Sequence, residues 1–135
     1  MKAERIVTGA LVAALAAFAA GGLWAFFGPR SFYEEVALFE PFNEHLFHDV
    51  GAFQLGLAMA AGLALAGLDG RRVALWGLAV AATMHTVSHA IDNDLGGRDS
   101  DVPLLAGLAA LLLVAAVLAS RTRKQPTEVN DAPAP

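Results

Sequence analysis

Histidine and carboxylate side chains recur at helical spacing in the stretch from residue 84 to residue 94. His85 and His89 are four residues apart, and Asp92 follows, so on a helix all three fall within an arc of roughly 60°. The stretch ends an apolar run long enough to cross a bilayer, where ionisable groups are costly and indicate a functional site by default. Two imidazoles and a carboxylate on one face can bind a metal ion or carry protons.

The other two histidines, His45 and His48, stand at the start of the preceding apolar run. If the two runs are antiparallel neighbours, all four histidines meet at one end of a bundle. Paired side chains at i,i+4 on facing helices are a recurrent way to hold a metal in a bundle core. The predicted ligands are His45, Asp49, His85 and His89, with Asp92 as a fifth ligand or an acceptor for an imidazole N–H, and His48 as a further ligand or an interfacial residue.

Three imidazoles and one carboxylate suit Zn²⁺ best, and Fe²⁺ or Mn²⁺ acceptably. The chain has no cysteine, which disfavours Cu(I) and excludes thiolate chemistry. A zinc site lowers the pKa of its bound water to about 7, so Asp49 or Asp92 would position or deprotonate that water. Two alternatives stay open: a proton-linked or structural polar network, and a haem b held by one histidine from each run.

The composition indicates that these residues belong to a membrane protein. Of 135 residues, 56% are hydrophobic and only 16% are charged, with a mean hydropathy of +0.53. A soluble domain of this size needs more charge on its surface. No basic stripe with interleaved aromatic residues is present, so we expect no nucleic-acid partner.

The hydropathy pattern predicts an all-α bundle of four transmembrane helices, forming a single domain over residues 1–119. Largely apolar stretches long enough to span a bilayer occur at 6–27, 46–68, 73–91 and 103–119. The alternative for the first is a signal peptide cut near 17–19, which would leave three spans. Residues 28–43 are expected to form a short surface helix or an ordered loop, and residues 120–135 a disordered cytoplasmic tail.

The basic residues are distributed unevenly between the two predicted sides of the membrane. One side would hold Lys2, Arg5, Arg71, Arg72, Arg121, Arg123 and Lys124, and the other only Arg30 and Arg98. The positive-inside rule then places both termini in the cytoplasm and the four histidines on the extracytoplasmic side. A cleaved signal peptide would not change the side on which the histidines lie.

Two resemblances follow from these motifs. The sequence Pro41-Phe42-Asn43-Glu44-His45-Leu46, with Asp49-Val50-Gly51, His85-Thr86-Val87-Ser88-His89 and Asp92, resembles a group of small four-helix bacterial membrane proteins without assigned function. That resemblance implies a bacterial plasma-membrane topology and no chemistry. The ligand set is also similar to that of the adiponectin-receptor and alkaline-ceramidase superfamily, seven-span hydrolases that hold zinc with differently ordered motifs. This second similarity concerns site chemistry alone.

Three functions are therefore expected. The first is a metal-dependent membrane hydrolase acting on a lipid or lipid-linked substrate at the outer leaflet. The second is a non-catalytic metal carrier or accessory subunit of a larger membrane complex, since a second span rich in Gly and Ala suits helix partners and also allows a homo-oligomer. The third is a bis-histidine haem protein. The sequence leaves open whether the protein is an enzyme.

Overall fold

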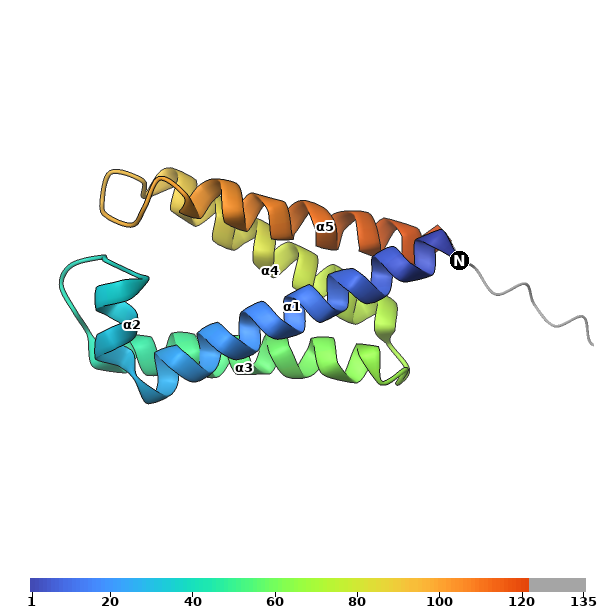
Figure 1. Ribbon diagram of the computed structural model, residues 1–135, viewed down its shortest axis with the longest axis horizontal. Helices are drawn as coiled ribbons and strands as arrows, with labels where there is room; N and C mark the ends of the chain where they lie inside the picture. Colours follow the sequence, from blue (N-terminus) through green and yellow to red (C-terminus); the bar gives the residue numbers. More distant parts are fainter. Residues whose placement is uncertain (122–135) are drawn as a thin grey trace, which may run out of the picture.

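The computed structural model describes residues 1–121, which form five helices and no named strand (Figure 1). The helices are α1 (Lys2–Phe27), α2 (Pro29–Glu35), α3 (Glu44–Leu65), α4 (Arg71–Ile91) and α5 (Asp101–Arg121). The all-helical class predicted from hydropathy is confirmed for these residues.

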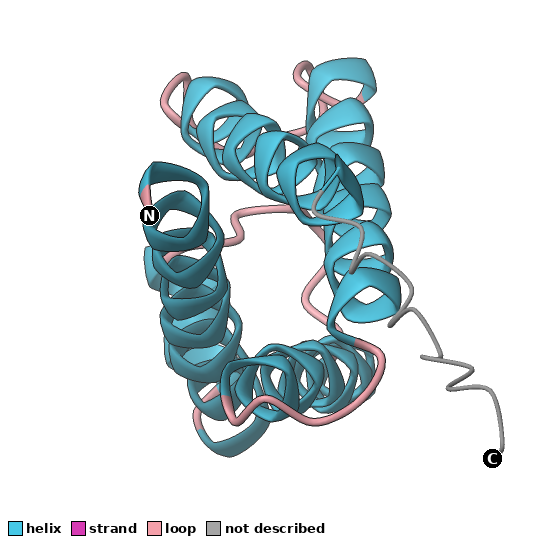
Figure 2. Ribbon diagram, turned by 90° about the vertical axis from the view of Figure 1, so that its right-hand side faces the viewer, coloured by secondary structure: helices cyan, strands magenta, loops and turns pink. Residues whose placement is uncertain are grey.

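The four long helices pack mainly as two pairs, α1 with α3 and α4 with α5. The two pairs are joined by contacts between α1 and α5 and by fewer contacts between α3 and α4. The view along the helices shows this four-helix arrangement (Figure 2). Of the neighbouring pairs of long helices, α3 and α4, which carry the histidines, therefore pack against each other least extensively.

The main core lies along the middle of these helices and consists largely of alanine and leucine. Its largest fully buried side chains are Leu11, Leu75, Leu78 and Leu112, one or two from each of α1, α4 and α5. The buried residues that α3 contributes to this core are the alanines Ala58, Ala61 and Ala64, and its partly buried Leu57 and Leu65 pack against the core. Small residues let helix backbones approach closely, which is how apolar helices gain packing energy without a hydrophobic driving force in lipid.

The tightest contact between α1 and α3 is formed by Gly22 and Gly51. A Cβ atom placed on Gly51 would lie 2.7 Å from the backbone N of Phe26 and 2.9 Å from the carbonyl O of Gly22. One placed on Gly22 would lie 3.0 Å from the backbone N of Leu55. The glycine at position 51 is thus required by backbone approach, as the composition of this stretch predicts.

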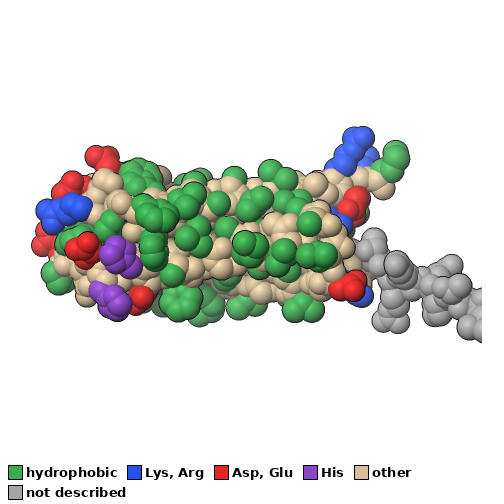
Figure 3. Space-filling model, turned by 90° about the horizontal axis from the view of Figure 1, so that it is seen from below, with side chains coloured by type: hydrophobic (Ala, Val, Ile, Leu, Met, Phe, Trp, Pro, Cys, Tyr) green, Lys and Arg blue, Asp and Glu red, His purple; other side chains and the backbone are tan. Residues whose placement is uncertain are grey.

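Three helices, α1, α3 and α5, are long and apolar enough to cross a membrane. Helix α4 is not among them, because arginines begin it and threonine, serine and histidine fill its second half. On the face drawn in Figure 3, charged side chains gather at both ends of the molecule, histidine side chains lie near one end, and the middle is largely apolar. We call the end with α2 and residues 92–100 the histidine end, and the end with residues 1–5, 66–72 and 118–121 the arginine end.

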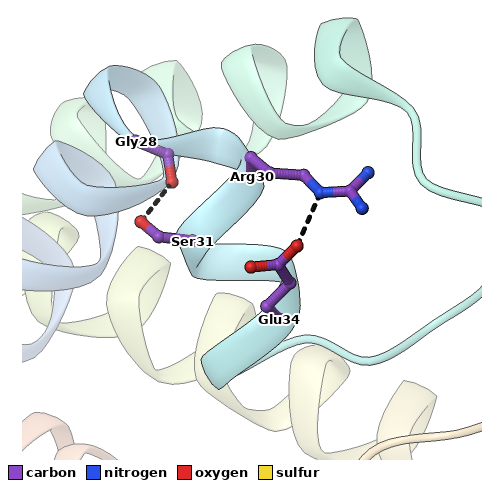
Figure 4. Close-up of polar contacts among 4 residues, drawn as sticks. All are labelled: Gly28, Arg30, Ser31 and Glu34. Carbon is purple, nitrogen blue, oxygen red and sulfur yellow. Dashed lines mark hydrogen bonds and ion pairs between the residues drawn. The ribbon is translucent and has the colours of Figure 1, made fainter.

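The connection 28–43 contains a short helix, one of the two alternatives expected there. Pro29 occupies the first turn of α2, where its missing N–H costs nothing. Ser31 Oγ donates a hydrogen bond to the carbonyl of Gly28 at 3.0 Å and accepts one from Trp24 Nε1 at 2.9 Å. Arg30 Nε lies 2.7 Å from Glu34 Oε1. Figure 4 shows the Ser31–Gly28 and Arg30–Glu34 contacts. These contacts fix the turn that leads from α1 into α2.

Several predicted boundaries need correction. The second predicted span ran to residue 68, but α3 ends at Leu65 because Gly67 adopts a left-handed φ of 78° and terminates the helix. Helix α3 begins at Glu44, capped by the Asn43 side chain, which accepts from Leu46 N at 3.2 Å. Helices α1, α4 and α5 likewise begin a few residues earlier than predicted. Helix α5 also extends to Arg121, whereas the tail was predicted to begin at residue 120. The rest of the predicted tail, residues 122–135, lies outside the described part of the chain.

Candidate functional site

One histidine cluster joins the end of α4 to the start of α5. The rings of His85 and His89 lie edge to face with centroids 4.7 Å apart, as their i,i+4 spacing requires. His89 Nδ1 lies 3.8 Å from Asp101 Oδ2 at the start of α5. Both of these side chains are mostly buried, at 18% and 20% exposure. Phe39, from the loop after α2, covers the other side of His89 at 5.5 Å between ring centroids.

Backbone contacts hold the loops of this cluster in place. Residues Phe39 and Gly96 form an isolated antiparallel bridge, and Gly97 N donates to Leu38 O at 3.4 Å. Asp101 Oδ2 also accepts the backbone N–H of Arg98 at 2.9 Å. The carboxylate of Asp101 therefore serves two purposes: it closes the loop that precedes α5 and lies beside the imidazole on α4.

The histidines of α3 form a separate group. His45 Nε2 lies 3.6 Å from Asp49 Oδ2, in the predicted i,i+4 pair, but the two side chains are 85% and 54% exposed. An exposed pair of this kind contributes little to stability. The ring of His48 packs on Phe26 of α1 with centroids 5.4 Å apart. No hydrogen bond, ion pair or ring contact joins these residues to His85 or His89 within residues 1–121.

The predicted metal-ligand set is accordingly not brought together. Over residues 1–121, no group of three or more His, Asp or Glu side chains is placed to hold a metal ion. Asp92 was expected to be a fifth metal ligand or to accept a hydrogen bond from an imidazole N–H. It instead lies at the C-terminal end of α4 and accepts a hydrogen bond from Ser88 Oγ at 3.4 Å. The four-histidine site needs α3 and α4 close together at the histidine end, and these two helices contact each other less than α1 contacts α3 or α4 contacts α5.

Asp101 is not among the candidate site residues predicted from the sequence. The length of the loop between the last two helices could have indicated its position. Two antiparallel helices joined by a loop of nine residues, 92–100, bring the first turn of the second level with the last turn of the first. Residue 101 must then lie near residue 89.

A polar stripe runs along the second half of α4. His85, Ser88 and Asp92 fall within roughly 60° of one another on the helix. The first two are exposed and the third is half-buried. Thr83 and Thr86, by contrast, satisfy their hydroxyls within the helix, donating to the carbonyls of Ala79 and Ala82 at 2.7 and 2.8 Å.

These observations define a class of protein: a helical protein with three helices able to span a membrane, and histidine–carboxylate contacts at one end of the fold. No protein-family model, curated protein or solved structure matches the chain. The resemblances suggested by the sequence motifs therefore stay predictions.

Proposed function

We propose that the chain is an integral membrane protein with four spans, both ends in the cytoplasm and the histidine end outside. The support for α4 as the fourth span is its packing against α5. Helix α4 is as long as α5, at 21 residues each, and packs against it extensively. If α5 crosses the bilayer, α4 crosses beside it. The excess of basic residues at the arginine end supports the orientation.

Within that membrane, we propose a non-catalytic role as an accessory subunit that binds a second membrane protein. The observation that carries this proposal is the exposure of His85, six residues before the end of α4 at Ile91. Six residues of helix place it about 9 Å inside that end. Ionisable side chains at such depth almost always face protein or water, or are paired. His85 contacts His89 and lies within electrostatic range of the Asp101 carboxylate, yet its side chain is exposed, so a further polar surface is needed to cover it.

The chemistry of the stripe indicates what the partner offers. An imidazole, a hydroxyl and a carboxylate, from His85, Ser88 and Asp92, supply both donors and acceptors. A partner helix with Ser, Thr, Asn or Gln at helical spacing complements them, and such contacts between helices are worth about 0.6 to 2 kcal/mol each. A lipid chain offers no such group. His85 and Ser88 are exposed, so this side of α4 is accessible to a partner.

Metal binding at the same place is the second candidate. The observation that favours it is the chain of contacts from His85 to His89 to Asp101, three donors from two helices. For a divalent ion such as Zn²⁺, these donors must rotate toward one point or take a ligand from a partner, since they do not converge among residues 1–121. A hydrolase would further require a carboxylate beside the bound water, the role predicted for Asp49 or Asp92.

One purification separates the two candidates. The full chain is purified from its own membranes in mild detergent, and both co-purifying proteins and metal are measured. We expect one membrane protein in near-stoichiometric amount and no stoichiometric metal. His85→Leu should lower the amount of partner about tenfold, equal to about 1.4 kcal/mol. Val87→Leu, on an exposed residue of the same helix outside the stripe, should not.

Two other outcomes would count against the accessory role. Near-stoichiometric zinc, iron or manganese without a partner, lost in a His85→Ala/His89→Ala variant, would support the metal site instead. An absorption band typical of haem would support the haem alternative. A preparation with no partner, no metal and no colour would contradict all three.

A further inference from the structure

A cavity lies at the arginine end, away from the histidines. Its volume is about 760 Å³, and it opens between α1, the start of α4 and the end of α5. Its polar lining consists of Glu4, Asp69, Arg71, Arg72, Trp76 and Ser120. We propose that this cavity binds the phosphate group of an anionic phospholipid. The inference depends on the chain being a membrane protein, and not on any partner of α4.

The two arginines of the cavity differ in how their charges are matched. Arg71 Nη1 lies 2.6 Å from Glu4 Oε1, and Nη2 donates to Thr8 Oγ1 at 3.5 Å. The Nε of Arg71 is buried and has no hydrogen-bond partner within the described residues. Arg72, next in the chain, is exposed and makes no ion pair among residues 1–121. Arg71 is thereby held as part of the wall, and Arg72 carries a charge free to bind an anion.

The net charge of this end favours an anion. The described basic side chains are Lys2, Arg5, Arg71, Arg72 and Arg121, against the acidic Glu4 and Asp69. Asp69 stands on the cavity wall and opposes an anion there, but the basic residues outnumber the acidic ones by five to two. Basic pockets between transmembrane helices on the cytoplasmic side typically hold anionic lipid head groups.

The apolar part of the cavity distinguishes a lipid from a free phosphate. Val7 and Leu118 line its inner side, and the exposed Val73 continues that apolar surface outward. Trp76 stands beside them with its indole N–H donated to Ser120 Oγ at 3.1 Å. Trp at such a position is typical of the membrane interface. A phosphate bound by Arg72 would thus leave its acyl chains along an apolar wall.

The test is lipid retention measured by native mass spectrometry on the full chain, after mixing with equal amounts of phosphatidylglycerol and phosphatidylcholine. We expect the wild type to retain phosphatidylglycerol preferentially. Arg72→Gln should lower its retention about fivefold, and Arg72→Lys should keep most of it. Arg5→Gln removes the same charge from the same end outside the cavity and should lower retention much less than Arg72→Gln does. Circular dichroism checks that each variant keeps its helices.

Three results would overturn the proposal. An equal loss in Arg5→Gln and Arg72→Gln would indicate general attraction by the charged end, without a site. Equal retention of phosphatidylcholine would show that the anionic head group is not selected. Displacement of the lipid by millimolar inorganic phosphate would identify a soluble phosphate as the ligand instead of a lipid.

Discussion

Gly51→Ala is expected to destabilise the protein by about 1–3 kcal/mol, the range found for overpacked interiors. The added methyl would lie under 3 Å from the backbone of Phe26 and Gly22, and backbone atoms cannot rotate away as a side chain can. Helices α1 and α3 would have to separate along their tightest contact. The measurement is the midpoint of thermal unfolding in detergent, followed by tryptophan fluorescence, since Trp24 lies on α1 near this contact.

Gly56→Ala is the matched control. Gly56 lies in the same helix, and a Cβ atom placed on it meets nothing within 4 Å. Alanine is the better helix former by about 1 kcal/mol, so this variant should be unchanged or more stable. Equal midpoints for the two variants would mean that α1 and α3 do not approach each other as described.

Asp101→Ala is expected to loosen the histidine end, with a loss of about 1–2 kcal/mol. The substitution leaves the Arg98 N–H without its acceptor, removes a carboxylate from the first turn of α5 and leaves His89 without its neighbour. A single cysteine at Leu95, in the loop before α5, reports the change through its rate of maleimide labelling. The native chain has no cysteine to interfere.

Asp99→Ala controls for the loss of a loop charge, because Asp99 is exposed and makes none of these contacts. A double-mutant cycle with His89→Ala then isolates the pair, and contacting residues of this kind should show a coupling of at least about 0.5 kcal/mol. Additive effects of the two substitutions would show that His89 and Asp101 do not interact.

The helices could be predicted from the sequence because their signals are local. The long apolar stretches, Asn43 as a cap, and Gly28-Pro29 as a break between helices act within a few residues. The error at the end of α3 is also local: the predicted span, 46–68, includes Gly67, whose left-handed φ ends the helix. Hydropathy alone could not establish α4 as a span, because the polar residues that suggest function also lower its hydropathy.

The site could be predicted only within single helices. The contacts of His85 with His89, and of His45 with Asp49, follow from the i,i+4 spacing. How closely two helices pack depends on how their small residues fit together along whole faces. The contacts are most extensive between α1 and α3 and between α4 and α5. Helices α3 and α4 are in contact, but their histidines are not brought together among residues 1–121, and that convergence is the step that the structure does not support. The metal itself stays a prediction.

The central claim, that another protein covers the polar stripe of α4, is tested most directly by photocrosslinking in intact membranes. A photoreactive residue is introduced at Ser88, on the stripe, or at Val87, at the same depth on a different face. We predict a protein adduct of one defined mass from position 88 and lipid adducts alone from position 87. An adduct of twice the mass of the chain would identify a second copy as the occupant. Lipid adducts alone from both positions would contradict the proposed accessory role.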